Sequence, residues 1–228
     1  GIKMNDKKKR IVVRIEIATI SDSNEKLNRK KMDRLAMVLS NLQNSGRQLI
    51  LVSSGAIAVG AEKLNLDQQP KSFIEKQAAA AVGQAELIKH YQRCFDEYNQ
   101  IVAQVLLPSD IIDKPVRIEN ARNTFDALLD MNIIPIVNEN DAVSTTDIEL
   151  DDNYPLALNV AKIVQADIIL IKLDTNGKFL IILKGKEKAT LVSNEYELFE
   201  KINTFCFGIN SKNKYIPDYP ASINEIVY

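Results

Sequence analysis

The chain alternates between short apolar runs and longer segments with helical periodicity, and this order restricts the fold more than any other feature. In residues 11–17, isoleucine and valine alternate with Arg14 and Glu16, which is the period-two pattern of a strand. Residues 32–42 repeat their apolar positions every three or four, as an amphipathic helix does. Further strand-sized runs lie at 48–52, 101–107, 133–137, 168–171 and 179–183, and helical segments at 71–98, 118–131 and 156–164. This alternation predicts an α/β fold with a mostly parallel sheet between layers of helices.

Length and charge exclude several classes of protein. We expect one domain over residues 1–228 with an N-terminal tail over about 1–10, and residues 184–228 are less regular and are left unassigned. Lys and Arg total 29 against 30 Asp and Glu, so the basic excess of a nucleic-acid-binding protein is missing. No run approaches the roughly 20 apolar residues of a membrane span. The polar start of the chain lacks the apolar segment of a secretory signal, so we expect a cytoplasmic protein.

The cysteines and the histidine offer little catalytic or metal-binding chemistry. Cys94 and Cys206 have no motif spacing, and we expect both to be buried free thiols rather than a disulfide. His90, the one histidine, lies in a charged helical stretch and is expected to be solvated. A Ser-His-Asp triad and a histidine-rich metal site both lack the residues they need, and no metal ligands are predicted.

Polar segments follow several of the predicted strands, at the edge of an open parallel sheet where ligands bind. Residues 53–56 read Ser-Ser-Gly-Ala, which suits either a tight turn or backbone amides that approach an anion at a helix start. In residues 138–141, Asn138 can bond a carboxylate and Asp141 can pair with an ammonium group, or the segment is a plain Asx turn. Residues 151–153 can cap the next helix or face a ligand. Together these loops suit a small zwitterion and indicate a small-molecule α/β enzyme, with phosphoryl transfer among the reactions they can serve.

Five sequence blocks in the same order resemble the glutamate 5-kinases of the amino acid kinase superfamily. They are residues 52–58, 76–84, 102–107, 120–124 and 135–141. The resemblance implies a three-layer α/β/α sandwich around a mainly parallel sheet, and ATP-dependent phosphorylation of the side-chain carboxylate of L-glutamate. The product, glutamyl 5-phosphate, leads into proline synthesis. A homodimer or homotetramer and feedback inhibition by proline are implied as well, whereas the C-terminal PUA domain of many members is not expected in 228 residues.

The same resemblance implies roles for individual residues. Those implied to bind substrate are Ser54, Gly55, Asn138, Asp141, Asp152 and Asn153. Those implied to bind nucleotide are Arg14, Asp174 and Gly177, and Arg14 also takes the catalytic position that the family gives to a lysine. Mg²⁺ is expected to arrive with ATP, because the chain has no dense carboxylate cluster to form a cage. A glutamate carboxylate, with a pKa near 4.3, is already a nucleophile at neutral pH, so no histidine base is needed.

The nucleotide half departs from the family pattern. Arg14 and Glu16 replace a lysine and a glycine, and because both side chains share one strand face, we expect them to pair. Tyr154 replaces an aspartate that can cap the following helix, and the family's Gly-Thr-Gly-Gly-Met loop is not found before residue 228. The alternative is that Glu16 and Tyr154 are surface substitutions with no effect on function. We expect weak ATP binding and slow turnover.

Several alternatives follow from these departures. The chain is a weakened or inactive kinase, a divergent active enzyme, or an altered or incomplete sequence. The alternative functions are a glutamate- or proline-binding regulator on the same fold, and a kinase of the same superfamily with another substrate.

Overall fold

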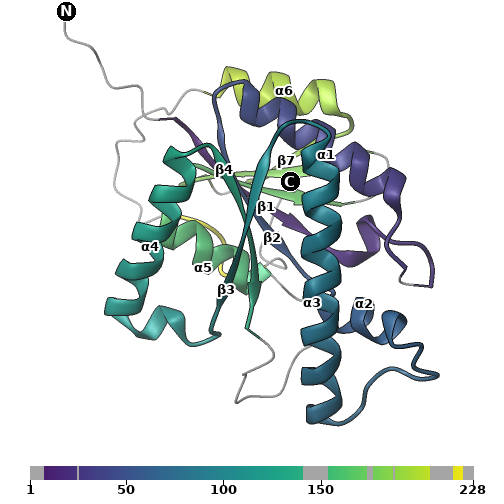
Figure 1. The fold of residues 1–228 in the computed structure, drawn as a ribbon. Helices are drawn as coiled ribbons and strands as arrows, with labels where there is room; N and C mark the ends of the chain where they lie inside the picture. The colour runs from purple at the N-terminus through teal and green to yellow at the C-terminus, as the bar shows by residue number, and fades with distance from the viewer. Residues whose placement is uncertain are drawn as a thin grey trace, which may run out of the picture.

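A computed structural model describes residues 8–24, 26–140, 154–173, 177–186, 188–205 and 218–222. Its core is a seven-stranded sheet in the order β3-β4-β2-β1-β5-β6-β7, with helices on both sides (Figure 1). The strands are β1 (Arg10–Ile15), β2 (Gln48–Ser53), β3 (Ile101–Leu107), β4 (Ile133–Glu139), β5 (Ile168–Lys172), β6 (Phe179–Leu183) and β7 (Thr190–Val192). The α-helices are α1 (Arg29–Asn44), α2 (Ala56–Lys63), α3 (Phe73–Asp96), α4 (Pro115–Asp130), α5 (Tyr154–Val164) and α6 (Glu195–Thr204). The predicted fold class is confirmed.

Pairing within the sheet is parallel from β3 through β5 and antiparallel from β5 to β7. The parallel strands are joined by helical crossovers, which cover both faces of the sheet. Every residue of β1, β2 and β5 is buried, as the continuous apolar run of residues 48–52 predicts. The mainly parallel sheet expected from the alternation of elements is therefore present.

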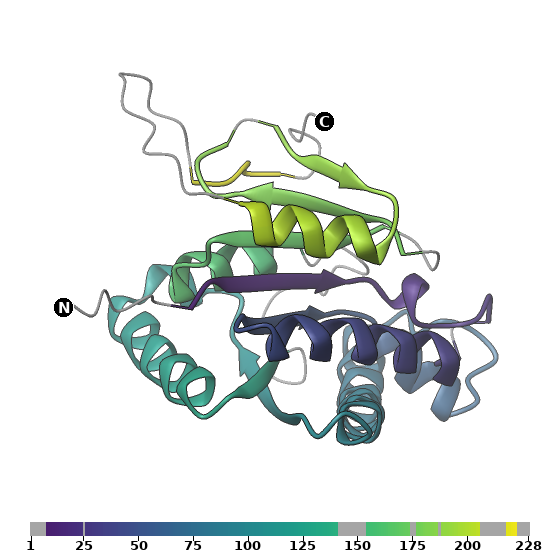
Figure 2. The ribbon, with the colours of Figure 1, turned by 90° about the horizontal axis from the view of Figure 1, so that it is seen from above.

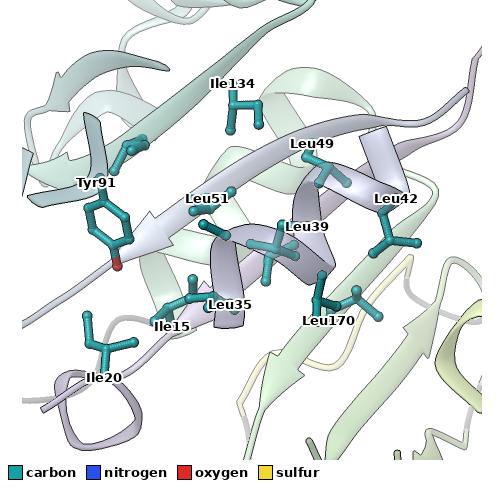
Figure 3. Close-up of a cluster of buried hydrophobic side chains, with 14 of the residues drawn as sticks. Ile15, Ile20, Leu35, Leu39, Leu42, Leu49, Leu51, Tyr91, Ile134 and Leu170 are labelled. Carbon is teal, nitrogen blue, oxygen red and sulfur yellow. The ribbon is translucent and has the colours of Figure 1, made fainter. Parts of the chain in front are cut away.

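Two hydrophobic cores lie on the two faces of the sheet. Side chains of α1, α3 and α6 pack in the first core with alternate residues of the strands, among them Ile11, Val13 and Ile15. Figure 3 shows this core, where Leu35 and Leu39 of α1 lie against the strands. Figure 2 shows α1 running alongside β1. Side chains of α4 and α5 pack in the second core with the intervening strand residues. Because successive side chains of β1 point to opposite faces of the sheet, the strand contributes residues to both cores.

The observed boundaries correct several predictions. The first strand ends at Ile15, not Ile17, because its pairing with β2 ends at Ser53 and a 3-10 turn (Ile17–Thr19) follows. The helix predicted from residue 118 begins at Pro115, since proline is accommodated in a first helical turn. Residues 71–98, predicted as one or two helices, contain the single helix α3, which begins with a capping box of Ser72 and Glu75. The unassigned end of the chain contains β7 and α6.

Helices α2 and α3 cross with their backbones in contact at two glycines. An added Cβ at Gly60 would lie 1.8 Å from the carbonyl oxygen of Ala79, and one at Gly83 would lie 1.6 Å from that of Ala56. Neither position can hold a larger residue without separating the helices. This close crossing fixes the direction of α2, whose N-terminus faces the carboxyl edge of the sheet.

The thiol and histidine predictions have mixed outcomes. Cys94 is a buried free thiol, as expected, and burial raises its pKa. Cys206 lies outside the described residues. His90, expected to be solvated, is partly exposed: 29% of its side chain reaches solvent, and its Nε2 lies 3.7 Å from Oε2 of Glu86. Across the described part of the chain, no helix has the length and apolarity needed to cross a membrane.

Candidate active site

The carboxyl ends of β1, β2 and β4 lie at one edge of the sheet. Arg14 of β1 is level with Val52 of β2, and Val52 is level with Val137 of β4. The residues that follow these positions therefore leave the sheet side by side. Ser54, Gly55 and Asn138 come together at this edge, as the sequence predicts for loops that follow parallel strands.

Gly55 shapes the turn between β2 and α2. Its φ is +93°, in the left-handed region that favours glycine, and it is the N-cap residue of α2. An added Cβ would lie 2.5 Å from the Cβ of Ile17 in the 3-10 turn after β1. The turn after β2 therefore packs tightly against the turn after β1. Free backbone amides at the start of α2 face this edge, where they can bind an anionic group.

Tyr91 of α3 lies in the first core and contacts the end of β2. Its hydroxyl lies 3.0 Å from Oγ of Ser53, and both residues are buried. Burial raises the pKa of Tyr91 well above its usual value, so the phenol stays neutral and bonds as a hydroxyl. Ser53 is therefore a supporting residue, which leaves the adjacent Ser54 as the serine at the surface of the site.

Asn138 is held at the end of β4 by its neighbours. Its Nδ2 donates to Oε1 of Gln84 at 3.0 Å, and its Oδ1 accepts from the backbone N–H of Glu139 at 2.9 Å. The side chain borders a hollow of about 320 Å³ between β4, the neighbouring β3 and α3. The Ala-rich face of α3, including Ala80 and Ala81, forms its other wall. Gln84 was not singled out for a role from the sequence, although it is the last residue of one of the five blocks.

Ser54 borders a different hollow, of about 460 Å³, on the β1 side of the edge. Glu16, Asp22 and Lys31 line the same hollow, and Nζ of Lys31 donates to the carbonyl of Ser21 at 2.7 Å. The structure thus places Ser54 and Asn138 at one edge but in two hollows. Lys31 was not predicted, since a lysine in the first turn of a helix carries no motif of its own.

Arg14 and Glu16 form the expected ion pair, although Glu16 is the extended residue between β1 and the 3-10 turn and not part of the strand. The side chain of Arg14 is 4% exposed, and that of Glu16 is 40% exposed. The guanidinium thus lies under the surface of the site with a carboxylate as its partner. This neutralises the charge that a phosphate group would meet at the family's lysine position.

Tyr154 is part of the second core. It is 1% exposed at the start of α5, and its hydroxyl donates to the carbonyl of Pro220 at 2.8 Å. The alternative that the changes at Glu16 and Tyr154 are harmless surface changes is therefore wrong for Tyr154. Tyr154 is the first residue of α5, where the sequence predicted the helix to start.

The remaining predicted site residues have separate outcomes. Asp141, Asp152, Asn153 and Asp174 lie outside the described residues. Gly177 adopts φ +90° in the connection from β5 to β6, where the backbone N–H of Leu173 bonds the carbonyl of Lys178 at 3.0 Å. This connection leaves β5 at the carboxyl edge of the parallel strands. Within the described ranges, no group of three or more His, Cys, Asp or Glu side chains is placed to hold a metal ion.

The fold and this edge define an α/β protein whose hollows at the carboxyl ends of the parallel strands are candidate small-molecule sites. The family model described as "Amino acid kinase family" matches residues 9–193, and the chain belongs to this family. It is 44% identical over 208 residues to the glutamate 5-kinase of Enterococcus faecalis, covering 90% of this chain and 77% of that protein. It is 42% identical over 208 residues to the glutamate 5-kinase of Listeria innocua, covering 90% and 75%.

Solved structures support the fold independently. The carbamate kinase of Giardia is similar with a TM-score of 0.54 at 17% identity, over 73% of each chain. A carbamate kinase from Giardia lamblia bound to AMP-PNP is similar with a TM-score of 0.51 at 13% identity, over 73% of this chain and 74% of that one. At these identities the likeness concerns the fold alone.

Proposed function

We propose that this protein phosphorylates the side-chain carboxylate of L-glutamate with ATP, forming glutamyl 5-phosphate for proline synthesis in the cytoplasm. The observation that carries the proposal is the 44% identity over 90% of the chain to a glutamate 5-kinase. The family match over residues 9–193 includes every strand of the sheet, β7 among them, so it reaches both halves of the proposed site.

The amino-acid half of the site rests on Ser54, Gly55 and Asn138. The amides at the start of α2 and the Ser54 hydroxyl supply donors for a carboxylate, and Asn138 supplies an amide fixed by Gln84. We assign Asp141, Asp152 and Asn153 to the same substrate, with Asp141 as partner of its ammonium group. These groups hold and orient glutamate, and orientation supplies a large share of rate acceleration in phosphoryl transfer.

The nucleotide half is proposed to use Arg14, Asp174 and Gly177. The glutamate carboxylate attacks the terminal phosphorus of ATP, the bond from that phosphorus to the bridging oxygen breaks, and ADP leaves. Mg²⁺ fits as an ion that is bound mainly by the phosphates, given the lack of a ligand cluster among the described residues. When bound, it would neutralise charge on the phosphates. Arg14 must contact the phosphates for this scheme, and Glu16 must then give up its ion pair.

One observation favours a second candidate function. Because Glu16 neutralises Arg14, a chain with an intact amino-acid half and a blocked nucleotide half would bind glutamate or proline without turnover. Such a chain would act as a regulator on the same fold. Assembly as a homodimer or homotetramer and inhibition by proline are proposed on the family resemblance.

The test is an ATP- and Mg²⁺-dependent assay in which hydroxylamine traps the acyl phosphate as a hydroxamate. L-Glutamate, L-aspartate and N-acetylglutamate are compared at equal concentrations. The proposal expects hydroxamate with L-glutamate and at least tenfold less with the other two. Calorimetric binding of glutamate with no hydroxamate would favour the regulator, and a preference for another acceptor would favour a different kinase of the superfamily.

A further inference from the structure

A basic hollow lies between α2, α3 and the segment before α1, away from the hollows that border Ser54 and Asn138. Its volume is about 380 Å³. Its lining side chains come from three separate parts of the chain. They are Lys26, Leu27, Val59, Glu62, Lys63, Asn65, Glu86, Lys89, His90 and Arg93. We call this set the α2–α3 hollow.

The walls of the α2–α3 hollow are set by the glycine crossing. Lys63 lies three residues beyond Gly60 on α2, and Glu86 lies three residues beyond Gly83 on α3, so each is about one helical turn past the contact. Because the backbones touch at the crossing, the two helices cannot slide together to fill the hollow. The charged groups are therefore presented on a fixed frame, which favours ligand binding over an adaptable surface.

The charge in the hollow is positive. Its lining includes four Lys and Arg side chains and two carboxylates, so with His90 neutral it carries a net charge of +2. Glu86 is engaged with Nζ of Lys89 at 3.1 Å and with Nζ of Lys63 at 3.5 Å. Lys26 and Arg93 form no ion pair with any described residue. The positive charges of Lys26 and Arg93 are therefore available to bind an anionic ligand.

His90 reports on this environment. Its Nε2 lies 3.7 Å from Glu86, and its pKa is lowered, first by burial and opposed by Glu86. The charged groups that surround it are Glu86, Lys89 and Arg93 of α3, Glu62 and Lys63 of α2, and Lys26. An added anion would favour the protonated imidazole over the neutral form.

We propose that the α2–α3 hollow binds a small anion with at least two negative charges, of the phosphate or polycarboxylate class. Both classes present several anionic oxygens, which match a cluster of ammonium groups and one guanidinium. A single negative charge would leave part of the positive charge uncompensated. The site is separate from the proposed kinase site, so it can be tested without any enzyme activity.

The experiment uses the one histidine of the chain as a reporter. The imidazole protons of His90 are followed by NMR from pH 5 to 8 in chloride, pyrophosphate or citrate at matched ionic strength. Binding raises the pKa of His90 by about half a unit or more, because the anion stabilises its charged form. The anion that produces the rise at the lower concentration identifies the class. A pKa that is the same in all three salts would overturn the proposal.

A double variant, Lys26→Gln with Arg93→Gln, removes the two cations of the hollow that form no ion pair within the described part of the chain. The matched control is Lys184→Gln with Lys201→Gln, which removes the same charge from exposed positions outside the hollow. The first variant should bind the anion at least tenfold more weakly, judged from the salt-induced rise in the pKa of His90, and the control should bind it like the parent. An equal response in the two double variants would show a general charge effect and would overturn the site.

Discussion

Arg14 and Glu16, two residues apart at the end of β1, form an ion pair that joins a buried guanidinium to a half-exposed carboxylate. The pair lies where the family resemblance places a lysine that acts on phosphate. Because Glu16 lines the same hollow as Ser54, its charge lies close to where ATP and glutamate would meet. Two unit charges about 4 Å apart interact by roughly 4 kcal/mol at an effective dielectric of about 20, so the carboxylate would oppose a polyanion strongly.

Replacing Glu16 with glutamine should therefore strengthen nucleotide binding. The expected change is about a tenfold lower Kd for AMP-PNP with Mg²⁺, measured by calorimetry, and little change in the Kd of glutamate. Asp22→Asn is the matched control, because Asp22 lines the same hollow but accepts a hydrogen bond from Asn28 instead of pairing with Arg14. Equal effects of the two substitutions would contradict a specific role for the Arg14–Glu16 pair.

The turn at Gly55 should be intolerant of a side chain. Gly55→Ala introduces strain at φ +93° and a Cβ 2.5 Å from Ile17, whereas Gly46→Ala introduces similar strain at φ +92° with nothing within 4 Å. We expect Gly46→Ala to lower the free energy of unfolding by about 1 kcal/mol and Gly55→Ala by at least about 2 kcal/mol. Urea denaturation of both variants measures the difference. Equal losses would mean that the contact between the two turns is unimportant.

Tyr154 should behave as a core residue with a structural hydrogen bond. Tyr154→Phe removes its bond to Pro220 and should lower the free energy of unfolding by about 1 kcal/mol. Tyr219→Phe is a close match, since that buried hydroxyl donates to the carbonyl of Ala166 at 2.8 Å. Tyr154→Asp, which would restore the family residue, should lower it by 3 kcal/mol or more, roughly the loss expected from an unpaired buried charge. A stable and more active Tyr154→Asp variant would refute the assignment of Tyr154 to the core.

His90 should make stability depend on pH near neutrality. Its pKa in the folded protein is lowered from a usual value of about 6.5, mainly by burial. The unfolded chain then binds more protons in this range, so stability should increase as the pH rises through the region below about 7. His90→Gln should flatten that part of the profile in thermal unfolding at low salt. A parent profile that falls with pH over the same range would contradict the direction of the shift.

The sequence predicts the layered fold because its signals are local. The apolar runs at residues 48–52, 101–107 and 133–137 correspond to β2, β3 and β4 within two residues. The end of β1 was missed, since the strand stops where the turn at Gly55 after β2 packs against Ile17, a contact between residues 38 positions apart (55 − 17). Strand β7 has only three residues, which is too short for a periodic pattern to reveal.

The sequence predicted the sheet edge at which Ser54, Gly55 and Asn138 lie, but not the contacts that hold them there. Because β2 and β4 are parallel, Ser54, Gly55 and Asn138 follow them at the same edge of the sheet. The polar composition of these loops therefore indicated where a site would lie. The supports from α3, Tyr91 to Ser53 and Gln84 to Asn138, depend on how a long helix crosses the sheet. No spacing rule along the chain indicates such contacts. The Arg14–Glu16 pair was predictable because the backbone stays extended through Glu16, one residue past the end of β1, so side chains two positions apart still fall on one side.

The most direct test of the central claim follows the oxygen atoms of the substrate. L-Glutamate labelled with ¹⁸O in its side-chain carboxylate is incubated with the protein, ATP and Mg²⁺, and the released inorganic phosphate is analysed by mass spectrometry. Transfer joins a labelled oxygen to phosphorus, so when the glutamate amine attacks the acyl carbon, that oxygen leaves with the phosphate. A kinase of the proposed kind releases ¹⁸O-labelled phosphate in a glutamate-dependent manner. Phosphate without the label, or none above the glutamate-free control, would contradict phosphorylation of the glutamate side chain by this protein.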